Sequence, residues 1–221
     1  MVLSGAVVGC DKGSDSSSGS SGSGSSVSAR IEAVNKAMRE TSFSATGTTT
    51  AFVGATQKMF WDPQQGLRIE VGGTPETAGG SMYCKDGTSY TDARLFSEML
   101  TQKGQSIDVP NHLLDRYVSS DTGKDCSFYF AISPDGQFAP DKDMTIDGKK
   151  ALAIQASSGL AEDVYFVSPE SPDHLLKQEA ARDGRVSRTT YSGFGAKVTI
   201  SMPPADKTMT MAEFRKAVAA G

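Results

Sequence analysis

Three of the four Asp-Gly dipeptides in this chain lie between short segments that resemble strands. They are Asp86-Gly87, Asp147-Gly148 and Asp183-Gly184, and the segments beside them are rich in β-branched and aromatic residues. Asp-Gly is favoured in the two-residue turns that join antiparallel strands, because both central residues of such a turn have a positive φ. The dipeptides therefore predict hairpins, and they direct the fold toward an antiparallel sheet.

The stretches between the turn signals predict a long series of strands. We place them within 43–53, 56–61, 67–71, 81–85, 88–90, 145–146, 151–156, 163–168, 175–180, 186–191 and 198–202. In one of them Leu67, Ile69 and Val71 alternate with charged residues, so one face of that strand is expected to be buried. The segment 164–167 is apolar on both faces, which indicates a covered strand in the middle of the sheet.

Helical spacing and capping residues predict a smaller helical part. The expected helices are one capped by Ser28 with Ile31, Val34 and Met38 on one face, one from Asp92 to about Gly104, one from Pro110 to before Gly123, and a closing helix opened by Thr210 and Glu213. Between Lys124 and Asp143 no structure is assigned, although Cys126 begins a strand-like stretch.

The N-terminal residues indicate export. Residues 3–10 read Leu-Ser-Gly-Ala-Val-Val-Gly-Cys and are followed from 11 to 27 by a Ser- and Gly-rich stretch that behaves as a flexible tether. The box resembles the lipobox of bacterial lipoproteins, which implies lipidation of Cys10 and anchoring at the extracytoplasmic face of the cell membrane. No Lys or Arg precedes the box, so the natural start is expected upstream of Met1. The alternative is an ordinary tail with an incidental cysteine.

The three cysteines also bear on the compartment. If Cys10 carries lipid, Cys84 and Cys126 remain as a pair, and an oxidising exterior favours a disulfide between them. The alternative is two buried free thiols, because sequence alone does not show that the two Cα atoms lie within bonding range.

Charge and length exclude several classes of protein. The 221 residues carry 26 acidic and 22 basic side chains, for a net charge of −4, and no basic cluster is longer than Lys149-Lys150. Nucleic acid is therefore not an expected partner. No run of 18 apolar residues occurs, so membrane contact is expected only through the anchor. Residues 28–221 are enough for a single domain with a core of ordinary size.

Motifs for covalent chemistry are missing from the sequence, so no catalytic residue, metal site or cofactor is expected. His112 and His174 are interpreted as surface histidines, since neither has a second ligand at a metal-binding spacing. Gly-x-Ser-x-Gly occurs nowhere outside the tether, no P-loop is present, and the stretch 193–195 reads as a turn. Glu162 and Asp163 are expected to be solvated acids of a hairpin.

The run Thr-Ile-Asp-Gly at 145–148, leading into Ala-Leu-Ala-Ile at 151–154, is followed by Tyr-Phe-Val at 165–167 and Leu-Leu at 175–176. Together with the lipobox and the tether, this layout resembles the LppX/LprG family of actinobacterial lipoproteins, which are related in fold to the LolA and LolB carriers. The resemblance implies an α+β fold in which a strongly curved antiparallel sheet, an open or half barrel, has helices covering its concave side. It also implies a cavity for the acyl chains of a lipid or glycolipid ligand.

Two functions remain in view. The first is a lipid-binding or lipid-carrying lipoprotein, and the second is an anchored interaction or regulatory lipoprotein with a filled core. The residues that decide between them are Trp61, Leu67, Ile69, Val71, Leu152 and Ile154. If these side chains face an unfilled concavity they form a lipid site, whereas tight packing across the same space favours the interaction protein.

Overall fold

The computed structural model of the chain describes residues 26–75, 79–171 and 173–220. Within them, thirteen strands form one large sheet. The strands are β1 Phe43–Thr48, β2 Thr56–Asp62, β3 Gly66–Val71, β4 Gly80–Lys85, β5 Thr88–Asp92, β6 Tyr117–Asp121, β7 Gln137–Phe138, β8 Met144–Ile146, β9 Lys149–Ser158, β10 Ala161–Val167, β11 Leu175–Arg182, β12 Arg185–Ser192 and β13 Thr208–Thr210.

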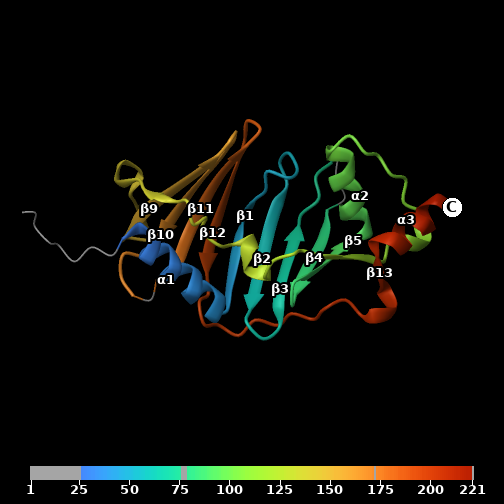
Figure 1. The fold of residues 1–221 in the computed structure, drawn as a ribbon, viewed down its shortest axis with the longest axis horizontal. Coiled ribbons are helices and arrows are strands. Elements are labelled where there is room, and N and C mark those ends of the chain that lie inside the picture. Colours follow the sequence, from blue (N-terminus) through green and yellow to red (C-terminus); the bar gives the residue numbers. More distant parts are fainter. Residues whose placement is uncertain (1–25, 76–78, 172, 221) are drawn as a thin grey trace, which may run out of the picture.

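The sheet is open at both ends. Its order is β13-β6-β5-β4-β3-β2-β1-β12-β11-β10-β9-β7, with β8 also paired to β9, and every pair is antiparallel except β13 with β6. The two halves of the chain meet where β1 pairs with β12, with Ala45 opposite Tyr191. Figure 1 shows the resulting curved sheet, which is not closed into a barrel. The predicted fold class is therefore confirmed.

Three helices accompany the sheet: α1 Val27–Glu40, α2 Ala93–Gln102 and α3 Met211–Ala220. The first begins two residues earlier than predicted, because Ser26 and not Ser28 is its N-cap and accepts a hydrogen bond from the Ala29 N–H at 3.2 Å. The N-cap Asp92 of α2 is as predicted. Thr210 and Glu213 form the predicted capping pair of α3.

A helix predicted from Pro110 is wrong. Only the 3₁₀ turn Asn111–Leu113 forms there, and the apolar residues that follow belong to β6. In β6, Ser119 lies opposite Tyr90 of β5. The backbone N–H and C=O groups of this stretch are therefore hydrogen-bonded within the sheet, although the local periodicity predicted a helix. The strand-like stretch at Cys126 is likewise a 3₁₀ helix, η2 Cys126–Tyr129.

The strand predicted at 198–202 also does not form. This stretch belongs to a segment without regular structure, residues 193–204, which we call the strap. It leads from β12 toward β13 and passes the lower ends of β1, β2 and β3 in Figure 1. Gln65 holds the strap in place of a strand partner: its Nε2 donates to the Val198 carbonyl and its Oε1 accepts from the Ile200 N–H, both at 2.9 Å. Alternation alone did not distinguish a sheet ladder from an extended segment fixed by a side chain.

Both faces of the sheet are covered near β9 and β10. Tyr165 and Val167 belong to the main core together with α1, whereas Val164 and Phe166 belong to a second, smaller cluster with Met144 of β8. The prediction that 164–167 is covered on both sides is therefore confirmed. We call the face that carries Tyr165 and Val167 the inner face.

A segment without regular strands covers the middle of the inner face. This cover segment, residues 122–136, contains η2 and passes in front of the strands in Figure 1. Cys126 in it is joined to Cys84 of β4 by the predicted disulfide, with Cα atoms 5.7 Å apart. Asn35 of α1 binds the segment at a second point through two hydrogen bonds. Its Oδ1 accepts from the Ile132 N–H at 2.8 Å, and its Nδ2 donates to the Ile132 carbonyl at 2.9 Å.

Candidate functional site

The six residues predicted to line a lipid cavity all lie on the inner face. Trp61 is opposite Leu67 across β2 and β3, and Ile69 and Val71 continue the same face of β3. Leu152 and Ile154 lie on β9, at the other side of the curved sheet. All six belong to the main apolar cluster or pack against it, so the structure brings together residues from distant parts of the chain.

The space between these two groups is filled by side chains. The cover segment contributes Phe130, whose ring lies 5.0 Å from that of Trp61 and 5.0 Å from that of Phe43. The indole Nε1 of Trp61 donates to the Arg39 carbonyl at the end of α1, at 3.2 Å. With Ile132 also buried in this cluster, the middle of the inner face is a packed core under its present cover.

A hollow remains where the apolar cluster ends. This inner hollow has a volume of about 180 Å³. It is lined by Thr49, Thr50, Gln57, Met59, Ile69, Tyr129, Gln178, Ala180, Ser187, Thr189 and Tyr191. Apolar and aromatic side chains therefore form one side of it, and hydroxyl and carboxamide groups form the other.

The polar side of the hollow is a connected network. The Tyr191 hydroxyl donates to Gln178 Oε1 at 3.2 Å, and Gln178 Nε2 donates to Asp163 Oδ1 at 3.2 Å. Asp163 is paired in turn with Arg182 at 2.5 Å. Burial raises the pKa of Tyr191, and it raises the pKa of Tyr165 beside it to about 12, so both phenols are neutral at physiological pH.

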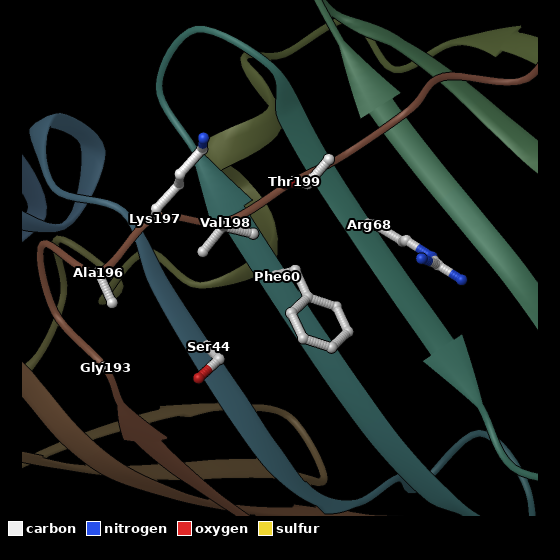
Figure 2. Close-up of a pocket in the computed structure, with 8 residues that line it drawn as sticks. All are labelled: Ser44, Phe60, Arg68, Gly193, Ala196, Lys197, Val198 and Thr199. Atoms are coloured by element: carbon white, nitrogen blue, oxygen red, sulfur yellow. The ribbon is translucent and has the colours of Figure 1, made fainter.

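A second hollow lies on the other face of the sheet. Its volume is about 280 Å³, and Figure 2 shows how the strap passes over β1, β2 and β3. Each of these strands contributes one labelled residue beneath the strap: Ser44, Phe60 and Arg68. We call it the strap groove.

A third hollow, of about 520 Å³, lies between the start of β9 and the loop before β11. In it the His174 ring is stacked on Phe194, with centroids 4.0 Å apart. Burial lowers the pKa of His174, so its imidazole is neutral near pH 7. His112 is exposed as predicted, but His174 is half-buried and so differs from the predicted surface histidine.

The two adjacent acids behave differently from the prediction. Successive residues of a strand face opposite sides of a sheet. Glu162 accordingly pairs with Lys142, whereas Asp163 points to the inner face, where it pairs with Arg182 and is only 15% exposed. The pair therefore does not form a two-carboxylate site, and Asp163 is not solvated.

Sequence reasoning missed the polar network of the inner hollow. Gln57, Gln178 and Thr189 come from three strands whose pairing is set by the closure of β1 on β12. A partial signal was present in β12, where Ser187, Thr189 and Tyr191 alternate with more exposed residues. That signal shows one inward face, but it does not show which strands lie beside it.

In the described part of the chain, no group of three or more His, Cys, Asp or Glu side chains is placed to hold a metal ion. No helix there is long and apolar enough to cross a membrane. Cys10 and most of the predicted tether lie outside the described residues. The arrangement at the inner face offers apolar contact and hydrogen bonding.

One solved structure shares this fold, and two others are similar to the chain at lower scores. An uncharacterized conserved protein from Thermus thermophilus is 11% identical, with a TM-score of 0.52, over 82% of this chain and 97% of that chain. The lipoprotein LppX from Mycobacterium tuberculosis is 9% identical, with a TM-score of 0.47, over 79% and 97%. LprF from Mycobacterium bovis is 14% identical, with a TM-score of 0.44, over 80% and 96%.

The sequence itself matches no family model and no curated protein. The likeness to the solved structure from Thermus thermophilus is one of fold alone.

Proposed function

We propose that this protein is a lipoprotein of the cell envelope that binds an acyl-chain ligand, a lipid or glycolipid, between the inner face of the sheet and the cover segment. One observation carries the proposal. The inner face is apolar and aromatic across seven strands, from β3 to β9, but its middle is closed by one helix and the cover segment 122–136. We propose the inner hollow as the mouth of this site.

Ligand binding requires the cover segment to move. The inner hollow, at about 180 Å³, is smaller than the roughly 300–1,000 Å³ of common ligand pockets. Acyl chains would take the place of cover side chains such as Phe130 and Ile132. Each methylene that leaves water contributes about 0.8 kcal/mol, which offsets the loss of those contacts. Segments outside the ladders of a sheet open at lower free energy than its central strands.

Binding of a fluorescent fatty acid tests the proposal. The full chain carrying Cys10→Ala, which has no anchor of its own, is expected to take up the probe and to release lipid into organic extracts analysed by mass spectrometry. Ile69→Lys is expected to lower probe affinity at least tenfold, because it places an ammonium group at the hollow. Thr46→Lys is the matched control, since it adds the same charge at an exposed position of the outer face.

Unfolding midpoints are measured for both variants. Ile69→Lys costs some stability, so its affinity is compared with the parent under conditions where both are folded. A parent chain with neither bound lipid nor probe uptake contradicts the proposal.

A second candidate function has its own support. The six predicted residues are packed under the present cover, as expected for an anchored interaction or regulatory lipoprotein with a filled core. Under this alternative the parent takes up no probe, and Ile69→Lys changes only the unfolding midpoint. The same two measurements therefore separate the two functions.

Anchoring is a separate prediction. In a bacterial host with a lipoprotein pathway, the protein is expected to fractionate with membranes, and Cys10→Ala is expected to move most of it to the soluble fraction, because the thioether-linked lipid is lost. Ser4→Ala, elsewhere in the predicted box, is the control that keeps the cysteine. Unchanged membrane fractionation of Cys10→Ala contradicts a covalent anchor.

A further inference from the structure

Three turns lie side by side at one end of neighbouring strands of the sheet. They are 49–55 between β1 and β2, 159–160 between β9 and β10, and 183–184 between β11 and β12. The strands that they join are consecutive in the sheet, in the order β2-β1-β12-β11-β10-β9, and Figure 1 shows the turns at the same end. Arg185 fastens two of them, because its Nη1 donates to the Thr50 carbonyl at 3.0 Å. We call these turns, with the first residues of β12, the rim.

The rim exposes aliphatic side chains. Leu160 is 87% exposed, Val53 is 73% exposed and Val186, which begins β12 beside its turn, is 56% exposed. They are the three most exposed large hydrophobic residues of the described chain, and the next two, Phe128 and Phe138, are near 40%. A single exposed aliphatic residue is normal for a soluble protein, but here two turn residues and one residue at the start of a strand gather on one rim.

The turn that carries Leu160 differs from the other two-residue turns of the sheet. The turns at 86–87, 147–148 and 183–184 are all Asp-Gly, with Asp at a φ of 49°. The turn at 159–160 is Gly-Leu, with Gly159 at a φ of 60° and Ser158 opposite Ala161. The backbone requirement is met by the glycine, so turn geometry does not call for a leucine at its tip.

The rim does not share the net negative charge of the chain. Its turns contain one acid, Asp183, which Arg185 on the same turn balances, while Arg182 is paired with Asp163. The whole chain, by contrast, carries a net charge of −4. The rim also borders the mouth of the proposed site, because Thr49 and Thr50 belong both to its first turn and to the lining of the inner hollow.

We infer that the rim docks on the surface of a lipid bilayer, with Leu160 and Val53 inserted among the head groups and Arg185 next to lipid phosphates. Aliphatic tips beside a cationic side chain are a combination that binds an anionic membrane interface. The inference that the protein docks depends only on the residues of the rim. Its role in bringing the inner hollow to the membrane for loading or delivery of a ligand rests on the proposed function.

Vesicle co-sedimentation tests the inference. The full chain with Cys10→Ala is mixed with vesicles of phosphatidylglycerol and phosphatidylethanolamine, so that no covalent anchor contributes. The double variant Val53→Ser/Leu160→Ser is expected to bind at least tenfold more weakly than this parent, because two aliphatic side chains no longer leave water. Phe138→Ser, which removes an exposed apolar side chain on β7, is the control and is expected to stay within twofold.

Each outcome has one meaning. Because Val53 and Leu160 are exposed, the unfolding midpoint of the double variant should match that of the parent. A parent that does not sediment with the vesicles, or a double variant that sediments as the parent does, overturns the inference. Uptake of the soluble fatty-acid probe is measured on the same proteins. Loss of vesicle binding with unchanged uptake supports the rim, whereas a parent that binds vesicles through the rim but takes up no probe refutes only the proposed function.

Discussion

Removal of the disulfide by Cys84→Ala/Cys126→Ala is expected to lower the free energy of unfolding by about 4 kcal/mol. The bond closes a loop between residues that are 42 apart in sequence. A cross-link across a loop of this length lowers the conformational entropy of the unfolded chain, which stabilises the folded state by roughly that amount. Both cysteines are buried, at 0% and 4% exposure, so their contacts are lost as well. Chemical denaturation of the parent and the variant measures the difference.

The same variant is expected to change ligand access. Without the disulfide, apolar packing and the two hydrogen bonds between Asn35 and Ile132 still hold the cover segment to the inner face. Opening becomes more frequent, so the fatty-acid probe should enter faster at a temperature where the variant is still folded. The parent treated with a reducing agent should behave alike. Equal denaturation midpoints for the oxidised parent and the variant would contradict the assigned role of the bond.

Replacing Phe43 by alanine is expected to cost about 3–5 kcal/mol of unfolding free energy. The Phe43 side chain is fully buried, and its ring meets those of Phe130 at 5.0 Å and Tyr191 at 5.6 Å. It therefore joins the cover segment to the strand pair at which the two halves of the sheet meet. The truncation leaves a cavity that these neighbours cannot fill without moving.

Phe60→Ala on the adjacent strand is the matched control. Phe60 points to the outer face, toward the strap groove, and is half-buried, so its truncation should cost less than half as much. Urea denaturation of both variants gives the comparison. Equal losses would mean that the inner face is not the main core of the protein.

Several features followed from the sequence alone, and all of them are local. The Asp-Gly turns formed as predicted because their geometry depends on two residues: Asp86, Asp147 and Asp183 each adopt a φ of 49° and are followed by a glycine at a positive φ. Asp92 and Thr210 cap helices because a cap is satisfied within three residues. Alternation in β3 and the doubly apolar run in β10 gave the buried faces correctly.

The predicted disulfide was a different kind of inference. It came from an odd number of cysteines and an expected export route, and the structure places Cys84 and Cys126 in bonding range. Composition thus identified the pair, but not the segment that the bond fastens to the sheet.

Only the tertiary structure decided the parts that matter most for function. The pairing of β1 with β12 joins residues about 145 positions apart, and no local pattern gives that register. The same holds for the strap, which is fixed by Gln65, and for β6, where sheet pairing replaced a predicted helix. The six inner-face residues occupy alternate positions of their strands, and this pattern is the same for a packed core and for a lipid site. Whether their apolar surface is covered by protein or by ligand depends on segments far away in the chain, because burial is a property of what packs against a face and not of the face itself.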